Sequence, residues 1–163
     1  MSQQVDLYNS TYGNFQKDVL ADVRRETYGE DIGQNSWITA DEYDTFFRWL
    51  KVSPGAHILE IASGSGGPAL YLAKKFRCGI TGMDINEDGL KTANQAARDA
   101  NIPDVKFQFV DVNQRLPFED ESFDAVMCID SMNHFRDRLA YLKEWQRVLR
   151  IGKRAVFTDP VVI

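Results

Sequence analysis

A short apolar run that leads into a glycine-rich turn constrains the fold of this chain more than any other feature. The segment, residues 57–69, reads His-Ile-Leu-Glu-Ile-Ala-Ser-Gly-Ser-Gly-Gly-Pro-Ala. The apolar run predicts a buried strand, and Pro68 suits the first turn of a helix that follows. Gly64 and Gly66 allow the backbone to approach a ligand closely. The segment therefore predicts a strand, a tight turn and a helix whose N-terminal amides favour a negative group.

The same alternation of strand and helix continues to the end of the chain. Further apolar runs predict strands at residues 79–83, 105–109, 123–129 and from 155. Helical spacing of apolar residues separates most of them, with one face formed by Leu139, Leu142, Trp145 and Leu149. Strands that alternate with helices indicate βαβ units. We therefore expect an α/β fold with a doubly wound, mostly parallel, Rossmann-like sheet of five strands.

The first third of the chain has a different pattern, which predicts helices. Phe15, Val19 and Val23 recur at helical spacing, and Thr39 with Glu42 forms a capping box at the start of a second helix. The turn at residues 53–55 ends this region. We expect two units: residues 1–53, an N-terminal helical arm and lid, and residues 54–163, a ligand-binding Rossmann-like domain.

Composition narrows the classes of partner and compartment. The 163 residues carry a net charge of −5 and contain no run of Lys or Arg, which argues against a nucleic-acid partner. No window approaches the roughly 18 apolar residues that span a bilayer, and the first 20 residues do not resemble a signal peptide. Cys78 and Cys128 lie outside any C-x-x-C motif. We expect a cytoplasmic protein with two free thiols, no membrane contact and no metal site.

Acidic residues stand near the ends of three predicted strands. Glu60 precedes the glycine turn, Asp84 follows the second strand 20 residues after Gly64, and Asp111 follows the third. Ligands of open α/β sheets bind at the carboxyl ends of the strands, where a carboxylate can accept hydrogen bonds from ribose hydroxyls or an adenine amino group. Each acid alone is also a common helix cap or strand end.

The negative charge of the Glu60 carboxylate distinguishes between two classes of ligand that a glycine-rich turn can bind. Gly64, Gly66 and Ala69 satisfy the loose dinucleotide fingerprint G-x-G-x-x-G/A, which favours a nicotinamide-dependent oxidoreductase. A carboxylate beside the turn repels a pyrophosphate, however, and attracts the ammonium and sulfonium of S-adenosylmethionine. The second ligand is favoured, and the oxidoreductase remains a weaker alternative.

The ordered set of motifs resembles the class I S-adenosylmethionine-dependent methyltransferases, especially those that act on small molecules in quinone biosynthesis or that methylate sarcosine or phosphoethanolamine. The matching segments are residues 60–66, 82–86, 109–112, 116–125 and 148–152. The resemblance implies a methyltransferase with S-adenosyl-L-methionine as cofactor and a small-molecule acceptor as partner. It also implies a cofactor site formed by Glu60, Ala62, Gly64 and Gly66 at the methionine part, Asp84 at the ribose, Ile85, Asp111 and Val112 at the adenine, and Ile129 at the methionine end.

The sequence departs from the family pattern at three places. Ala62 stands where the family usually has its first glycine, which is acceptable if φ is negative. Ile151 and Lys153 replace the usual Pro and Gly around Gly152. The chain stops at Ile163, after the fifth strand, whereas the family sheet normally has seven. We therefore expect an exposed sheet edge that pairs with a second copy as a homodimer, and a non-catalytic cofactor-binding module remains an alternative function.

A few further residues are candidates for the site. His134, after the fourth strand, can serve as a catalytic general base, although packing or capping is the more common role of such a histidine. Trp37, with Asn35 and Ser36, is expected to form a lid over the cofactor, with a plain core position as the alternative. Tyr8 and Tyr12 can also reach the site from the N-terminal arm.

Overall fold

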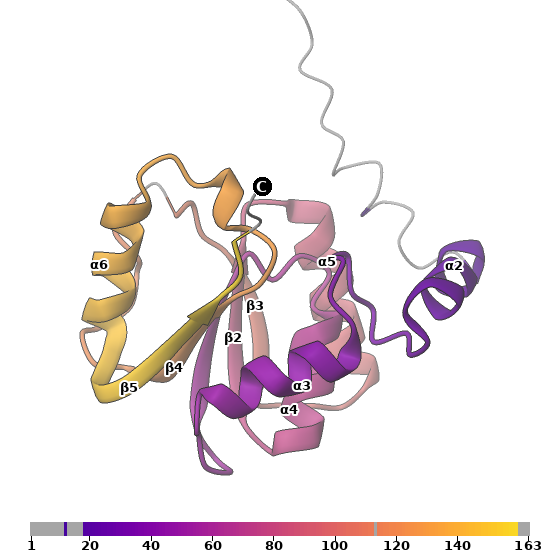
Figure 1. Ribbon diagram of the computed structural model, residues 1–163, viewed down its shortest axis with the longest axis horizontal. Coiled ribbons are helices and arrows are strands. Elements are labelled where there is room, and N and C mark those ends of the chain that lie inside the picture. The colour runs from indigo at the N-terminus through magenta and orange to yellow at the C-terminus, as the bar shows by residue number, and fades with distance from the viewer. Residues whose placement is uncertain (1–11, 13–17, 113, 160–163) are drawn as a thin grey trace, which may run out of the picture.

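The computed structural model describes residues 12, 18–112 and 114–159, and in this part five parallel strands form one sheet (Figure 1). The strands are β1 (His57–Ile61), β2 (Gly79–Asp84), β3 (Val105–Phe109), β4 (Phe123–Cys128) and β5 (Leu149–Phe157), in the spatial order β3-β2-β1-β4-β5. The expected parallel Rossmann-like sheet is confirmed.

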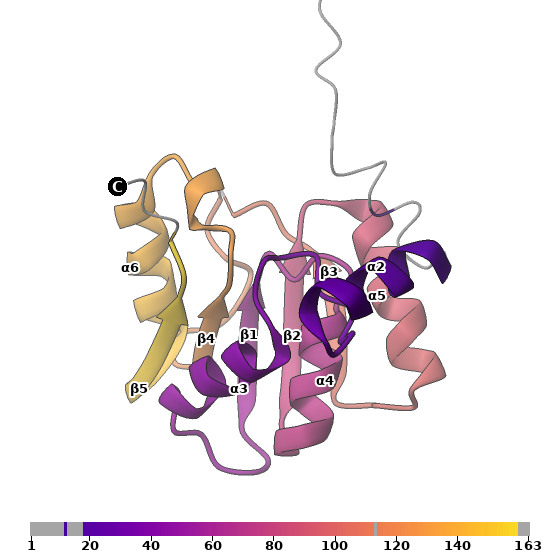
Figure 2. The ribbon, with the colours of Figure 1, turned by 45° about the vertical axis from the view of Figure 1, so that its right-hand side comes forward.

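Helices cover the two faces of the sheet unequally. The helices α3 (Ala40–Trp49), α4 (Gly67–Phe76) and α5 (Glu87–Asp99) pack on one face, and α6 (Arg138–Val148) packs on the other, as the two core clusters and Figure 2 show. Neighbouring residues of the central strand β1 supply the two cores: Ile58 belongs to the first cluster and Leu59 to the second. Both are fully buried, which explains why the strands are continuous apolar runs.

β1 occupies the centre of the sheet and determines where a ligand can bind. It pairs with β2 on one side and with β4 on the other, so the chain reverses its direction of progress across the sheet at β1. Such a switch point opens a crevice at the carboxyl ends of the strands. Glu60 lies in this position, opposite Gly82 of β2 and Met127 of β4.

The N-terminal region contains α2 (Asp18–Tyr28) and α3, joined by a loop. The capping box predicted at Thr39 and Glu42 is present, with both of its reciprocal hydrogen bonds. Phe47 of α3 stacks on Phe76 of α4 with ring centroids 4.4 Å apart, so α3 belongs to the sheet-covering layer. Phe15 and Tyr8 lie outside the described residues.

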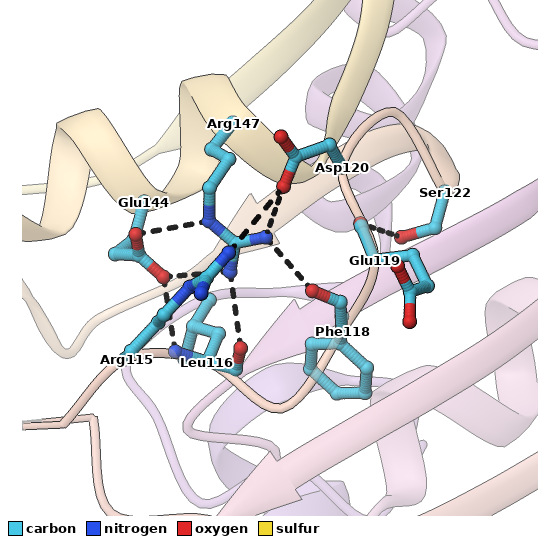
Figure 3. A network of polar contacts seen from close by, with 8 residues as sticks. All are labelled: Arg115, Leu116, Phe118, Glu119, Asp120, Ser122, Glu144 and Arg147. Carbon is cyan, nitrogen blue, oxygen red and sulfur yellow. Dashed lines mark hydrogen bonds and ion pairs between the residues drawn. The ribbon is translucent and has the colours of Figure 1, made fainter.

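The link between β3 and β4 contains no helix in its described part and is fastened to α6 by one arginine (Figure 3). Arg147 donates to the carbonyls of Phe118 (2.8 Å) and Leu116 (3.0 Å) and forms ion pairs with Glu144 and Asp120. Glu144 in turn accepts a hydrogen bond from the backbone N–H of Leu116 at 3.0 Å. These contacts replace the hydrogen bonds that a regular element would have supplied.

The structure corrects two expectations for the last elements. β5 begins at Leu149, not at residue 155, because Leu149 already has extended backbone at the end of α6. The buried face of α6 consists of Tyr141, Trp145 and Val148, whereas Leu139 is 64% exposed. Aromatic contacts explain the difference, since Trp145 packs against the rings of Phe135 and Phe157.

β5 is one of the two outer strands of the sheet, the other being β3, and it is mostly exposed along its length, including Ile151 at 86%. The exposed edge that the sequence predicted is therefore present in the structure. Among the described residues, none of the helices has the length and apolar character that crossing a membrane requires.

Candidate functional site

A cavity of about 1180 Å³ opens at the carboxyl ends of the strands. Nine of the residues predicted for the cofactor and catalytic sites line it, and so do the further candidates Tyr12, Asn35 and Ser36; the nine are Trp37, Glu60, Ala62, Gly64, Asp84, Ile85, Val112, Ile129 and His134. Gly66 and Asp111 are not among the lining residues. The cavity exceeds the roughly 300–1,000 Å³ typical of small-molecule sites, so it has room for more than one ligand group.

Asp84 joins the glycine turn to the end of β2. Its Oδ2 atom accepts a hydrogen bond from the N–H of Gly64 at 2.8 Å, and its Oδ1 atom accepts one from Asn86 at 2.8 Å. Each carboxylate oxygen has a further lone pair, so Asp84 can hold the turn and still accept from a ligand hydroxyl. The side chain that was predicted to bind ribose thus also determines the shape of the turn.

Glu60 is a buried carboxyl group at the bottom of the cavity. The residue is 5% exposed, and its Oε2 atom has no hydrogen-bond partner among the described residues. Burial, assisted by the nearby Asp84 carboxylate, raises the pKa of Glu60 to about 8. A buried acid without a partner is costly to ionise, and a cationic ligand group would remove that cost.

Gly66 and Gly64 are glycines for different physical reasons. A Cβ atom on Gly66 would lie 2.5 Å from Phe107 and 2.7 Å from Ala93, both in the core behind the turn. Packing against β3 and α5 therefore requires a glycine at position 66, and the role of Gly66 at the cofactor stays a prediction. A Cβ atom on Gly64 would instead lie 2.6 Å from the hydroxyl of Tyr12, on the cavity side.

Ala62 has a positive φ of 57°, so the condition of a negative φ is not met. Residues with a Cβ atom adopt this conformation at a cost of roughly 1–2 kcal/mol. The backbone at Ala62, the first position of the turn, is therefore strained, whereas a glycine at this position would not be strained.

The loop that connects α2 to α3 lines the cavity with residues 34–37. Asp31 pairs with Arg24 of α2 at 2.7 Å, and both side chains are nearly buried. Gly33 accepts a hydrogen bond from Ser65 Oγ at 3.3 Å, which ties the loop to the glycine turn. On the far side, the N–H of Trp37 donates to Asp130, just beyond β4, at 3.3 Å.

These ties were not predicted, because Arg24, Asp31 and Asp130 have no distinctive sequence signal. The indole of Trp37 is 82% exposed, so Trp37 is not a core residue. Trp37 lines the cavity, and its role as a lid stays a prediction.

Aromatic hydroxyls and a histidine complete the wall. Tyr12 reaches the cavity and lies against Gly64. Tyr43 of α3 is buried, which raises its pKa, and its hydroxyl is 3.2 Å from Ser36 Oγ. His134 ends a short 3₁₀ helix (Met132–His134) and is exposed on the cavity side after β4.

Fold and site together define a Rossmann-like α/β protein that binds a ligand at the switch point of its sheet. A family model described as "Methyltransferase domain" matches residues 59–157. This chain belongs to that family.

Proteins of similar sequence are also named as methyltransferases. The chain is 31% identical over 156 residues to 27-O-demethylrifamycin SV methyltransferase from Amycolatopsis mediterranei (strain S699), covering 90% of this chain and 57% of the relative. It is 31% identical over 144 residues to sarcosine/dimethylglycine N-methyltransferase from Halorhodospira halochloris, covering 86% and 50%. The chain thus spans about half the length of these relatives.

A solved structure supports the fold. Phosphoethanolamine N-methyltransferase 2 from Haemonchus contortus, in complex with S-adenosyl-L-methionine, superimposes with a TM-score of 0.71 and 22% identity, covering 88% of this chain and 34% of that one. At this identity, the likeness concerns the arrangement of helices and strands.

Proposed function

We propose that this chain is the cofactor-binding part of an S-adenosylmethionine-dependent methyltransferase that acts on a small molecule. The observation that carries the proposal is the Oε2 atom of Glu60, which is buried beside the glycine turn, belongs to a residue that lines the cavity and has no hydrogen-bond partner among the described residues. The methionine part of S-adenosylmethionine brings an ammonium and a sulfonium to this position. A dinucleotide would bring a pyrophosphate, which Glu60 disfavours.

The lining residues divide between the two halves of the cofactor. We assign Glu60, Ala62 and Gly64 to the methionine part and Asp84 to the ribose hydroxyls. Ile85 is 60% exposed at the rim, where it offers an apolar surface to adenine.

The remaining predicted residues act at the edges of the cofactor. Val112 lines the cavity and Asp111 precedes it, so we keep both at the adenine edge. Ile129 and Trp37 would enclose the methionine end. Gly66 supports the turn from behind.

Methyl transfer requires mainly positioning, because the acceptor atom must approach the methyl carbon in line with the bond that breaks. When bound, the cofactor supplies the methyl group on a positively charged sulfur. We place the acceptor beside Ser131 and His134, on the β4 side of the cavity. There His134 would accept the proton that an oxygen or carbon acceptor loses.

We also propose a division into domains, a cellular location and an oligomeric state for this chain. We retain residues 1–53 as an N-terminal arm and lid, of which α3 is the part that packs on the sheet, and residues 54–163 as the cofactor domain. A cytoplasmic location is consistent with Cys78 and Cys128, which are buried and form no disulfide.

We further propose that the chain self-associates through β5. Sedimentation tests this proposal, and a strictly monomeric chain would contradict it.

Calorimetric titration tests the function directly. We expect binding of S-adenosylmethionine and S-adenosylhomocysteine, and none of NAD. Asp84→Ala should weaken binding by about 1–3 kcal/mol, because ribose hydroxyls lose a charged acceptor. Asp84→Asn, which keeps one acceptor oxygen, should lose less, and Asp99→Ala, on an exposed acid at the far end of α5, should lose nothing. Equal affinity of the folded Asp84→Ala protein would refute the ribose assignment.

A further inference from the structure

The charge balance around Glu60 is unusual for a buried carboxyl group. Its Oε2 atom is enclosed and has no hydrogen-bond partner among the described residues, and the charged group that acts on it is another acid, Asp84. The two cationic side chains that line the described cavity are engaged elsewhere: Arg24 pairs with Asp31 and Lys91 with Asp88. The described residues that line the cavity therefore bring no positive charge to Glu60.

The groups that face Glu60 from the neighbouring elements reinforce this balance. Asp84 lies at the end of β2, Tyr43 on α3 and Cys128 on β4, and each of them interacts electrostatically with Glu60. Tyr12 and Asp130 also line the cavity and raise the pKa of Tyr43. Burial raises the pKa values of Tyr43 and Cys128, so both remain neutral at physiological pH. The surroundings of Glu60 are therefore neutral or acidic.

Such surroundings keep the carboxyl group protonated when the cavity is empty, in accord with its pKa of about 8. An ammonium group that enters the cavity beside Glu60 reverses the balance, since an opposite charge at short range favours the ionised acid. The pKa of Glu60 then falls, and the carboxyl group loses its proton.

We infer that the cavity binds its cofactor with release of a proton from Glu60, so that cofactor affinity rises with pH. The inference rests on the proposed function. The proton passes from the Glu60 carboxyl group to the solvent, and the ammonium of the ligand takes its place as the neutralising partner. No covalent bond of the ligand changes in this step.

The experiment is calorimetric titration with S-adenosylhomocysteine in phosphate and in Tris at pH 7, two buffers that differ in the heat they take up with a proton. We expect release of about one proton per ligand, and a Kd that falls by about tenfold from pH 6 to pH 7. The matched ligand control is 5′-methylthioadenosine, which keeps the nucleoside and the thioether but lacks the ammonium. It should bind without release of a proton.

A matched variant provides a second measurement. Glu60→Gln keeps the size of the side chain and should bind S-adenosylhomocysteine more weakly, with the same heat in both buffers. If this variant does not fold, the comparison of the two ligands on the unaltered chain still decides. Binding of S-adenosylhomocysteine by the unaltered chain with equal heat in both buffers would overturn this inference alone. Absence of binding at any pH would overturn the proposed function and this inference together.

Discussion

Glu60 and Glu144 are the same residue type in two regions that treat a carboxylate in opposite ways. Glu144 accepts hydrogen bonds from Arg147 and from the backbone of Leu116, and the bond from Arg147 lowers its pKa (Figure 3). Glu60 has an unpartnered Oε2 atom among the described residues and a raised pKa. The comparison teaches that the α6 region pairs its carboxylate internally, whereas the cavity keeps a buried carboxyl group that ionises only when a cationic ligand group pairs with it.

The largest expected effect is a dependence of stability on pH that comes from Glu60. The acid has a pKa near 4.5 when unfolded and about 8 when folded, so the folded state binds more protons between these values. The free energy of unfolding should therefore fall as pH rises through this window, by at most about 5 kcal/mol. Urea titrations of the unaltered chain and of Glu60→Gln, without ligand, give the difference. A difference that is constant from pH 5 to pH 8 would contradict the assignment.

The second effect tests whether Gly66 belongs to the core or to the cavity. Gly66→Ala would place a Cβ atom 2.5 Å from Phe107, in addition to the cost of its positive φ of 76°. We expect a loss of roughly 3 kcal/mol of unfolding free energy. Gly55→Ala is the matched control, because Gly55 also has a positive φ but nothing within 4 Å of its Cβ position. Equal losses in the two variants would show that packing is not the reason for Gly66.

The third effect concerns the internally satisfied region. Arg147→Met removes the donors to the carbonyls of Leu116 and Phe118 and leaves Glu144 without its cation. Unfolding free energy should fall by about 2–3 kcal/mol. Arg25→Met, which removes an exposed pair with Asp22, should leave the denaturation midpoint almost unchanged. If both variants behave alike, the network is not a significant source of stability.

The smallest effect is the release of strain at Ala62. Glycine adopts a φ of 57° without a steric penalty, so Ala62→Gly should raise the unfolding free energy by about 1 kcal/mol. Thermal denaturation measures the change. An unaltered or lower melting temperature would indicate that the alanine methyl group contributes packing that offsets the strain.

The sequence by itself determined the order of strands and helices and the acids at the strand ends. Apolar runs such as residues 57–61 and the capping box at Thr39 are local signals, because burial and backbone hydrogen bonding act on neighbouring residues. The positions of Glu60 and Asp84 at the carboxyl ends of β1 and β2 follow from that order. For this reason most of the predicted site residues line one cavity.

Only the tertiary structure decided which distant groups meet. The bond between Trp37 and Asp130 joins residues 93 positions apart, and the pair of Arg24 and Asp31 fixes a loop that has no sequence signature. The contact behind Gly66, the buried face of α6 and the early start of β5 also depend on neighbours supplied by other elements. Such contacts depend on how whole elements pack, and the energy of packing is not encoded in any single stretch of sequence.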